Sequence, residues 1–252
     1  LMVVMPGASS FDEALAWTAD VYRVAGKMMD EAGKLQGVAD EGGYWPAFAT
    51  NEEGLELLVR AIERAGLVPG EQAAISLDIA ATEFCHDGRY KLALEERELD
   101  SDGLADLLVS WVDRYPIISI EDPMSEDDAI GMRRFTEAVG NRVQIVGDDF
   151  VVTNANRIKR AAGDGACNAA LIKPNQAGTL SETHAALKAA RDAGWGGIVS
   201  ARSGETEDVT VAHLAVGWGV LQLKVGSFAR AERMAKWNEV LRIEERLGDR
   251  AR

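Results

Sequence analysis

From about residue 73 to its end, the chain alternates short runs of apolar and β-branched residues with segments of helical periodicity. The runs occupy residues 73–77, 117–120, 143–146, 169–172, 197–200 and 220–223. Runs this short and this continuously apolar predict strands that are buried on both faces, as in a parallel sheet. Strands that alternate with helices through short connections predict an α/β fold. We expect most of a (β/α) barrel, of the TIM type, with a doubly wound sheet as the second interpretation.

Helix start signals stand between these runs. Three segments begin with a capping box, in which Glu follows Ser or Thr after two intervening residues. The pairs are Ser10–Glu13, Thr50–Glu53 and Thr179–Glu182. Ser101 is the expected start of a fourth helix, and Ser125 with Asp128 that of a fifth. Residues 229–247 predict a long final helix, and the acidic run 205–208 is consistent with the negatively charged start of another.

The charge balance and the cysteine content exclude several classes of protein. The 252 residues include 27 Lys and Arg against 41 Asp and Glu, which gives a formal net charge of −14. Nonspecific binding to nucleic acid needs clustered cationic side chains, so we expect no nucleic-acid partner. No apolar run approaches the length of about 18 residues that a membrane span needs, and we find no signal-peptide pattern. Two cysteines, Cys85 and Cys167, form no disulfide framework. We therefore expect a cytoplasmic protein.

Each predicted strand is followed by a polar residue that is capable of chemistry. In chain order these are Asp78, Glu121, Asp148, Lys173, the segment 200–203 and Lys224. In a barrel the carboxyl ends of all strands face one mouth, so we expect these side chains to converge there. A single acid after a strand is more often a helix cap or an ion-pair partner, but capping alone does not explain the whole series.

The carboxylates of this series predict a metal site. Asp78, Glu121 and Asp148 offer only oxygen ligands, which suits Mg²⁺ with water or substrate completing its octahedron. Asp149 directly follows Asp148 and is an alternative ligand. The cationic residues later in the series, beginning with Lys173, predict an anion site and a general base.

The motifs at these strand ends resemble those of the enolases. They read SLD at 76–78, IEDP at 120–123, VGDD at 146–149, LIKPNQ at 171–176, RSGETED at 202–208 and KVGS at 224–227. The similarity covers essentially the whole chain in the family's order, from DEGG at 40–43 to LRIEE at 241–245. It corresponds to the C-terminal barrel of the family. We therefore expect residues 1–252 to form that barrel domain, without the family's N-terminal α+β domain and first barrel strands.

Enolases interconvert 2-phosphoglycerate and phosphoenolpyruvate. The resemblance implies that Asp78, Glu121 and Asp148 hold the Mg²⁺ to which the substrate carboxylate binds. It implies that Lys173 is the base that removes the proton next to that carboxylate. This proton is very weakly acidic, so the reaction needs positive charge where negative charge develops.

The resemblance also implies roles for residues that contact the substrate elsewhere. Glu41 corresponds to the acid that helps hydroxide to leave, Arg202 and Ser203 to contacts with the phosphate, and Lys224 to a contact on the carboxylate side. The implied partners are a small phosphorylated acid as substrate and further copies of the chain in a homodimer or larger homo-oligomer.

Three features depart from the family pattern. Ala201 stands where enolases usually carry His, beside the leaving group, so its presence should weaken or redirect the chemistry. Tyr44-Trp45-Pro46-Ala47 stands where the family commonly has Phe-Ala-Pro-Asn, and a Trp in place of Ala should change the volume near Glu41. The family's N-terminal domain and its closing loop are missing, which favours a piece of a longer polypeptide over a chain completed by a partner.

These departures leave three functions open. The first is an enolase-type lyase that acts on 2-phosphoglycerate. The second is a divergent enzyme of the same superfamily, which acts on a related phospho- or phosphono-enolpyruvate compound in phosphonate biosynthesis. Ala201 and Trp45 favour this second function. The third is a non-catalytic binding or scaffold protein, which has no need for three convergent carboxylates and two lysines.

Overall fold

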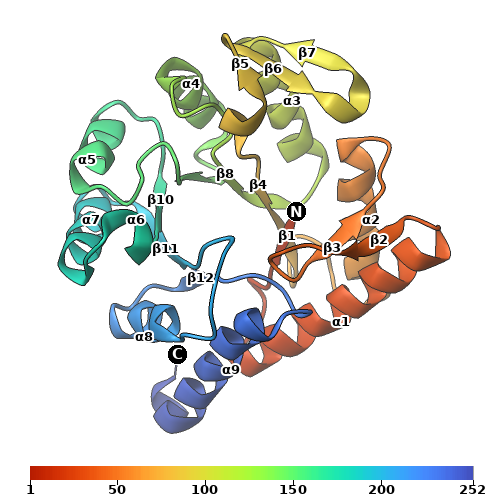
Figure 1. The fold of residues 1–252 in the computed structure, drawn as a ribbon, viewed down its shortest axis with the longest axis vertical. Helices are drawn as coiled ribbons and strands as arrows, with labels where there is room; N and C mark the ends of the chain where they lie inside the picture. The colour runs from red at the N-terminus through yellow and green to blue at the C-terminus, as the bar shows by residue number, and fades with distance from the viewer. Residues whose placement is uncertain (252) are drawn as a thin grey trace. The chain divides into compact units, whose positions relative to one another are not determined.

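A computed structural model describes residues 1–251 of the chain. Strands and helices alternate along it, so the predicted α/β class is confirmed (Figure 1). The chain divides into two compact units. Unit 1 comprises residues 1–2 and 75–198, and unit 2 comprises residues 3–74 and the chain from Val199 onward.

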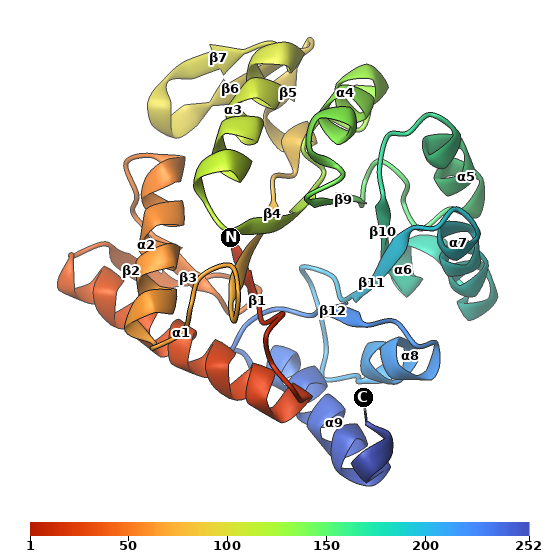
Figure 2. The ribbon, with the colours of Figure 1, turned by 180° about the vertical axis from the view of Figure 1, so that it is seen from behind.

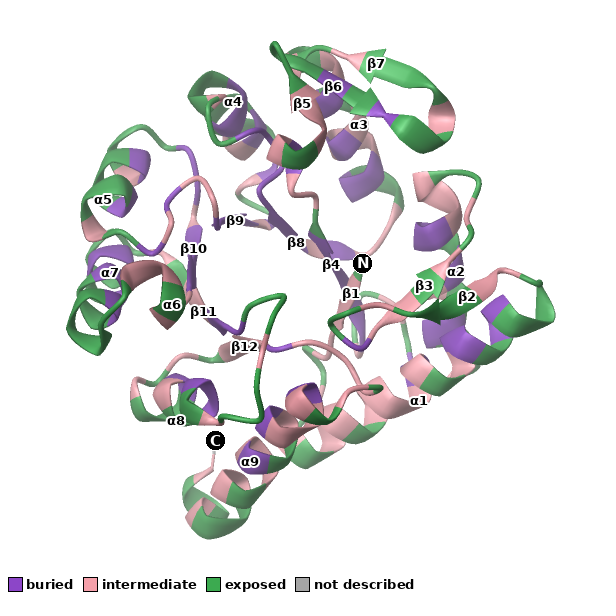
Figure 3. Ribbon diagram, viewed as in Figure 1, coloured by how far each residue is buried: buried purple, intermediate pink, exposed green. Residues whose placement is uncertain are grey.

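Parallel strands in chain order form the centre of unit 1. They are β4 (Ala74–Asp78), β8 (Ile117–Glu121), β9 (Gln144–Gly147) and β10 (Ala169–Ile172), and β11 (Gly196–Ser200) begins beside β10. Most of their apolar residues are buried, as Figure 3 shows. The order of these strands does not reverse, as it would at the centre of a doubly wound sheet. Unit 1 therefore agrees with the barrel interpretation.

Helices of unit 1 follow the strands and pack on one another. They are α3 (Ser101–Arg114), α4 (Ala129–Val139), α5 (Ala155–Gly163), the single turn α6 (Pro174–Ala177) and α7 (Leu180–Asp192). Helix α3 packs on α4 and on β8. Helix α7 packs on α5 and on β10 (Figure 2). Val146, Ala169 and Leu171 form a buried cluster that Ile198 extends. Burying such side chains contributes about 1.5–3 kcal/mol for each large one.

The helix starts confirm the capping boxes and correct two other predictions. Side chains of Ser10, Thr50 and Thr179 accept from the backbone N–H three residues on, as expected. The cap of α3 is Asp100 rather than Ser101, because the Asp100 carboxylate accepts from Gly103 N at 2.8 Å. Likewise Asp128, and not Ser125, caps α4.

A small antiparallel sheet between β4 and α3 was not predicted. It consists of β5 (Cys85–His86), β6 (Arg89–Leu92) and β7 (Arg97–Leu99), and short 3₁₀ turns cover 81–84 and 93–95. Tyr90 of β6 is buried, and its hydroxyl donates to Asp128 Oδ2 at 2.9 Å and accepts from Ser125 N at 3.1 Å. Burial raises the pKa of this Tyr90 hydroxyl. The sheet is thereby fixed to the loop before α4.

Unit 2 is formed from the two ends of the chain. Its elements are β1 (Met2–Val4), which begins at the boundary of unit 1, α1 (Phe11–Glu31), β2 (Leu35–Val38), β3 (Tyr44–Pro46), α2 (Asn51–Arg64), α8 (Thr210–Gly217), β12 (Gln222–Lys224), α9 (Ala231–Leu247) and a 3₁₀ turn at 248–250. Helix α1 packs on α2 and α9. The acidic run 205–208 lies in a loop rather than in a helix, because α8 begins only at Thr210. None of the described helices combines the length and apolar composition that crossing a membrane would require.

The β2–β3 hairpin is attached to α1 by aromatic packing. The rings of Tyr22 and Tyr44 stack with their centroids 4.2 Å apart, and Phe228 lies beside Tyr22 at 5.6 Å. Gly26 of α1 makes this possible, since a Cβ at that position would lie 2.3 Å from the Tyr44 hydroxyl. The hairpin turn that carries Glu41 therefore has a fixed base.

Candidate active site

The parallel register directs several predicted site residues of unit 1 to one face of its strands. Asp78, the last residue of β4, pairs with Glu121, the last residue of β8, and Glu121 pairs with Val146 of β9. Side chains alternate between the two faces along a strand. Asp148 and Lys173 stand an even number of residues beyond the register partners on their own strands. Asp78 and Glu121 therefore share a face, and Asp148 and Lys173 directly follow the next two strands at positions in phase with it.

Asp148 and Lys173 form an ion pair at the carboxyl ends of β9 and β10. Lys173 Nζ donates to Asp148 Oδ2, and Gln176 Nε2 donates to Asp148 Oδ1 at 3.0 Å. Only 13% of the Lys173 side chain and 10% of the Asp148 side chain are exposed. Because the pair is shielded from water, salt should screen it much less than it screens a surface ion pair. Each carboxylate oxygen of Asp148 has a hydrogen-bond partner, Lys173 for Oδ2 and Gln176 for Oδ1.

A buried hydroxyl connects this ion pair to the backbone. Thr153 Oγ1 donates to Gln176 Oε1 at 2.7 Å and accepts from the Lys173 backbone N–H at 2.9 Å. Val152 and Thr153 have φ values of 45° and 50°. This region is unfavourable for β-branched residues, and strained backbone concentrates at functional sites. The strained turn after β9 therefore contains Thr153, which holds the Lys173 backbone and the Gln176 side chain.

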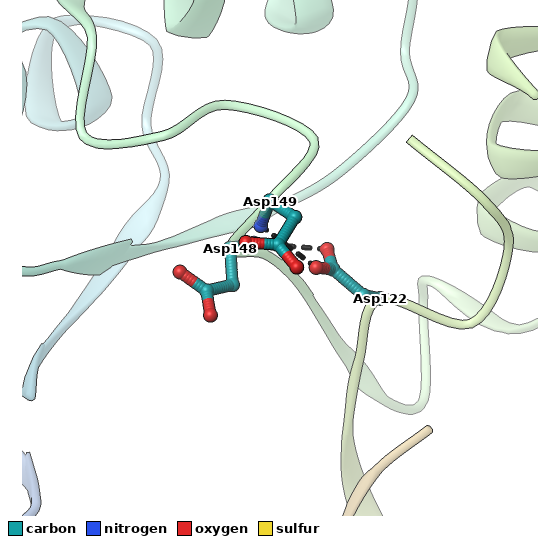
Figure 4. Close-up of side chains that lie close together, drawn as sticks. All are labelled: Asp122, Asp148 and Asp149. Carbon is teal, nitrogen blue, oxygen red and sulfur yellow. Dashed lines mark hydrogen bonds between the residues drawn. The ribbon is translucent and has the colours of Figure 1, made fainter. Parts of the chain in front are cut away.

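Asp122 holds the turn that carries Asp148 (Figure 4). Its Oδ1 accepts from Asp148 N at 2.9 Å, and its Oδ2 accepts from Asp149 N at 2.7 Å. Burial raises the pKa of Asp122 to about 7, against the effect of these two hydrogen bonds. Burial and the neighbouring Asp148 carboxylate also raise the pKa of Asp149. The carboxylates therefore lie close together although burial and mutual repulsion disfavour their charged forms. Side chains whose pKa is raised in this way are concentrated at functional sites.

Within residues 1–251, Asp122, Asp148 and Asp149 each offer a carboxylate oxygen within 4.8 Å of the others. The predicted ligands were Asp78, Glu121 and Asp148, with Asp149 as the alternative. Both oxygens of Asp122 are occupied by backbone N–H groups, and in Figure 4 the Asp148 carboxylate points away from Asp122. We therefore assign Asp122 to holding the turn, because its partners are backbone groups, whereas those of Asp148 are the side chains of Lys173 and Gln176. Among the described residues, Asp78 and Glu121 do not join Asp148 in a group that meets this distance, so the three predicted ligands stay a prediction.

The predicted ligand set fits a hard divalent cation. Asp78, Glu121 and Asp148 supply only carboxylate oxygens, the ligands that Mg²⁺ and Ca²⁺ prefer. Taken as whole residues, backbone included, Glu121 and Asp148 are only 3% and 7% exposed. Buried carboxylates need a positive partner to offset their lost hydration. The residues present therefore suit the metal that the sequence predicted.

The remaining predicted site residues lie in unit 2. Glu41 lies in the turn between β2 and β3, and Lys224 ends β12. Arg202 and Ser203 lie in the loop after β11, and both are exposed, as is Glu41. The Glu41 carbonyl accepts from Ser227 N at 2.6 Å, so the backbone of the hairpin turn contacts the segment after β12.

The two unusual residues differ in their surroundings. Ala201 is only 6% exposed, and its N–H donates to the Lys224 carbonyl at 2.9 Å, so it is a fixed and buried position. Trp45 is 59% exposed. An exposed Trp45 gives no support to the prediction that its ring changes the volume near Glu41, whereas the substitution at Ala201 affects a confined position.

Comparison with known proteins decides the family. The chain matches the family model described as "Enolase, C-terminal TIM barrel domain" over residues 1–252. The chain belongs to the enolase family. It is 47% identical over 250 residues to Enolase 2 of Pseudomonas syringae pv. syringae (strain B728a) and, equally, to Enolase 2 of Pseudomonas syringae pv. tomato (strain ATCC BAA-871 / DC3000). Each match covers 99% of this chain but 58% of the relative's length.

Membership of the enolase family confirms the resemblance and the fold class that the motifs predicted. Sequence reasoning missed the residues that orient the site. Asp122 and Gln176 stand inside the quoted enolase motifs, which was the available signal, but only the structure shows their hydrogen bonds to Asp148 and its turn. Thr153 lies outside those motifs and gave no signal.

Proposed function

We propose that this enolase-family protein is a Mg²⁺-dependent lyase that reversibly dehydrates 2-phosphoglycerate to phosphoenolpyruvate. The observation that supports the proposal is the register of unit 1, which pairs Asp78 with Glu121 at the ends of β4 and β8, while Asp148 and Lys173 directly follow the next two strands. Hard cation ligands beside a general base are the groups that proton abstraction next to a carboxylate requires.

In this proposal Asp78, Glu121 and Asp148 hold the metal. When bound, Mg²⁺ would offset the negative charge that develops on the substrate carboxylate as the neighbouring proton leaves. Lys173 Nζ takes that proton. Gln176 holds Asp148, and Thr153 holds the Lys173 backbone. To accept a proton, Lys173 Nζ must be uncharged and must leave its ion pair with Asp148, which a cation bound to Asp148 would favour.

The residues of unit 2 have the roles that the family resemblance implies. Glu41 donates a proton to the departing hydroxide, Arg202 and Ser203 bind the phosphate, and Lys224 binds on the carboxylate side. Arginine suits a phosphate because its planar fork can donate two parallel hydrogen bonds. We also propose, on the family resemblance alone, a cytoplasmic location and assembly into a homodimer or larger homo-oligomer.

Two assays test the reaction and its base. The wild-type full chain with Mg²⁺ should form phosphoenolpyruvate from 2-phosphoglycerate, and should exchange the substrate C2 proton with deuterated water. Lys173→Ala should abolish this exchange and leave Mg²⁺ binding, measured by calorimetry, intact. Lys188→Ala is the control, because the Lys188 side chain is 67% exposed and pairs with Asp192 in the same helix. Exchange at the wild-type rate in Lys173→Ala would remove the role from this residue.

Ala201 favours a second candidate function. A buried alanine replaces the family's histidine at a position fixed by its hydrogen bond to Lys224. A divergent enzyme would use the same metal ligands and Lys173 on a related phospho- or phosphono-enolpyruvate skeleton. A wild-type protein that binds Mg²⁺ but forms no phosphoenolpyruvate would favour this function over the first.

A further inference from the structure

Arg233, in the first turn of α9, is 1% exposed. Its closest ion-pair contact among the described residues is Glu232 Oε1, 3.9 Å from Nε, and that Nε makes no hydrogen bond within residues 1–251. A buried charge without a closely bonded counter-charge is unfavourable unless other groups solvate it. The partners of this guanidinium therefore indicate what it does.

Backbone carbonyls from two separate loops surround the Arg233 guanidinium. Nη1 donates to the Arg202 carbonyl at 2.6 Å, and Nη2 donates to the Ser203 carbonyl at 2.5 Å. Nη2 also donates to the Asp40 carbonyl at 3.4 Å. One side chain thus connects the two proposed phosphate contacts with the residue that precedes Glu41.

Gly226 brings a third segment to the same junction. It has a φ of 98°, and a Cβ there would lie 2.6 Å from Arg233 Cδ and 2.6 Å from the Glu41 carbonyl oxygen. Only glycine permits both approaches and this backbone conformation. The next residue, Ser227, donates its N–H to the Glu41 carbonyl at 2.6 Å. The segment after Lys224 therefore packs against both Arg233 and the Glu41 turn.

Lys236, one turn further along α9, has a narrower role. It is also fully buried, but its ammonium donates to the Thr206 carbonyl at 2.6 Å and pairs with Glu205 Oε2 at 3.1 Å. Both groups belong to the loop after β11. Of these two buried cations of α9, Arg233 is therefore the one that connects the loop after β11 with the hairpin turn.

We propose that Arg233 is a positioning residue that sets Glu41 and the Arg202–Ser203 segment in one geometry, an inference that rests on the proposed function. Its planar fork directs donors to two loops at once. A lysine ammonium is a single point charge on a flexible stem and does not reproduce that geometry. Arg233 touches no reacting atom and acts through the residues that it holds.

The division of roles between the units provides the test. The proposed metal ligands and base lie in unit 1, whereas every backbone group that Arg233 holds lies in unit 2. In the full chain, Arg233→Gln should raise the KM for 2-phosphoglycerate and lower the kcat for dehydration by about 100-fold, the effect that a misplacement of about 1 Å can have. Exchange of the C2 proton at saturating substrate should fall much less.

The controls separate positioning from loss of structure. Arg242→Gln removes another cation of α9, one that is 55% exposed and pairs with Glu239, and should leave both rates unchanged. Arg233→Lys keeps the charge and should show the same split between exchange and dehydration, including in the event that Arg233→Gln does not fold. Dehydration and exchange that fall in proportion, or that both stay at wild-type levels, would overturn the proposal.

Failure of the proposed function is recognisable separately. A wild-type protein with neither C2 exchange nor phosphoenolpyruvate formation refutes that function. Amide hydrogen exchange then tests Arg233 without any substrate. Faster exchange in residues 39–42 and 202–206 of Arg233→Gln, but not of Arg242→Gln, would support the positioning role, and equal protection in both variants would overturn it.

Discussion

Ala201 combines a buried position with a side chain that has no proton to donate. It is 6% exposed, and its backbone N–H is bonded to the carbonyl of Lys224. Enolases usually carry histidine here, next to the leaving group. The backbone therefore fixes where residue 201 lies. Its side chain decides whether a proton donor stands at that position.

Restoring the imidazole should distinguish an impaired enolase from a redirected one. If the full chain dehydrates 2-phosphoglycerate weakly, Ala201→His should raise kcat, since a positioned general acid contributes about 10²–10⁴-fold. The measurement is phosphoenolpyruvate formation at saturating substrate. Ala32→His, at the exposed end of α1, is the control for an added imidazole. Wild-type turnover already at ordinary enzyme rates, about 1–10³ per second, would refute the idea that Ala201 marks an altered function.

At the scale of elements, the start of α3 shows how one residue decides a helix boundary. The Asp100 carboxylate accepts from Gly103 N at 2.8 Å, and Ser101 is already inside the helix. An acidic cap also interacts favourably with the positive end of the helix dipole. The position of the cap therefore has a measurable consequence for stability.

Replacing the true cap should destabilise the protein, and replacing its neighbour should not. Asp100→Ala should lower the free energy of unfolding by about 0.5–2 kcal/mol, the usual effect of removing a cap. Ser101→Ala should change it by less than about 0.5 kcal/mol, because the half-buried Ser101 does not cap the helix. Urea unfolding of the full chain measures both. A loss confined to Ser101→Ala would return the cap to Ser101, and equal losses in the two variants would contradict a cap made by Asp100 alone.

The buried strands and the capped helices could be predicted because their signals are local. Continuous apolar runs produced β4, β8, β9 and β10 with small errors at their ends. The β2–β3 hairpin was missed because its strands are short and largely exposed, and so have no apolar run. The β5–β7 sheet was missed because it depends on Tyr90, whose hydroxyl bonds to Asp128, a residue distant in sequence.

The candidate site was predictable to the same extent. Residues directly after an apolar run, such as Glu121 and Lys173, can be found because the end of a strand can be found. The function of Asp122 in holding the Asp148 turn depends on the register of β8 against β9, which the sequence alone does not specify. Arg233 was missed because its partners are backbone carbonyls, and these have no sequence signature.

At the scale of the whole molecule, the proposed roles divide between the two units. Unit 1 contains the proposed metal ligands and the base, whereas unit 2 contains the proposed contacts to phosphate and to the leaving hydroxide. A ligand that binds only the folded protein stabilises it according to its concentration relative to Kd. Binding of the metal alone should therefore stabilise unit 1, which contains its proposed ligands, and this stabilisation can be measured without substrate.

Mg²⁺ should protect unit 1 locally and stabilise the protein through Asp148. At about 100 times its Kd, the ion should add about 2.7 kcal/mol to the stability of the wild-type protein. Amide hydrogen exchange should slow at the carboxyl ends of β4, β8 and β9, where Asp78, Glu121 and Asp148 stand.

Asp148→Asn should lose both effects, because an amide neither carries the charge nor matches a carboxylate as a ligand for a hard ion. Asp192→Asn, an exposed partner of Lys188, should keep them. Equal stabilisation of both variants would move the metal away from Asp148, and protection confined to residues 39–42 and 202–206 would place it in unit 2.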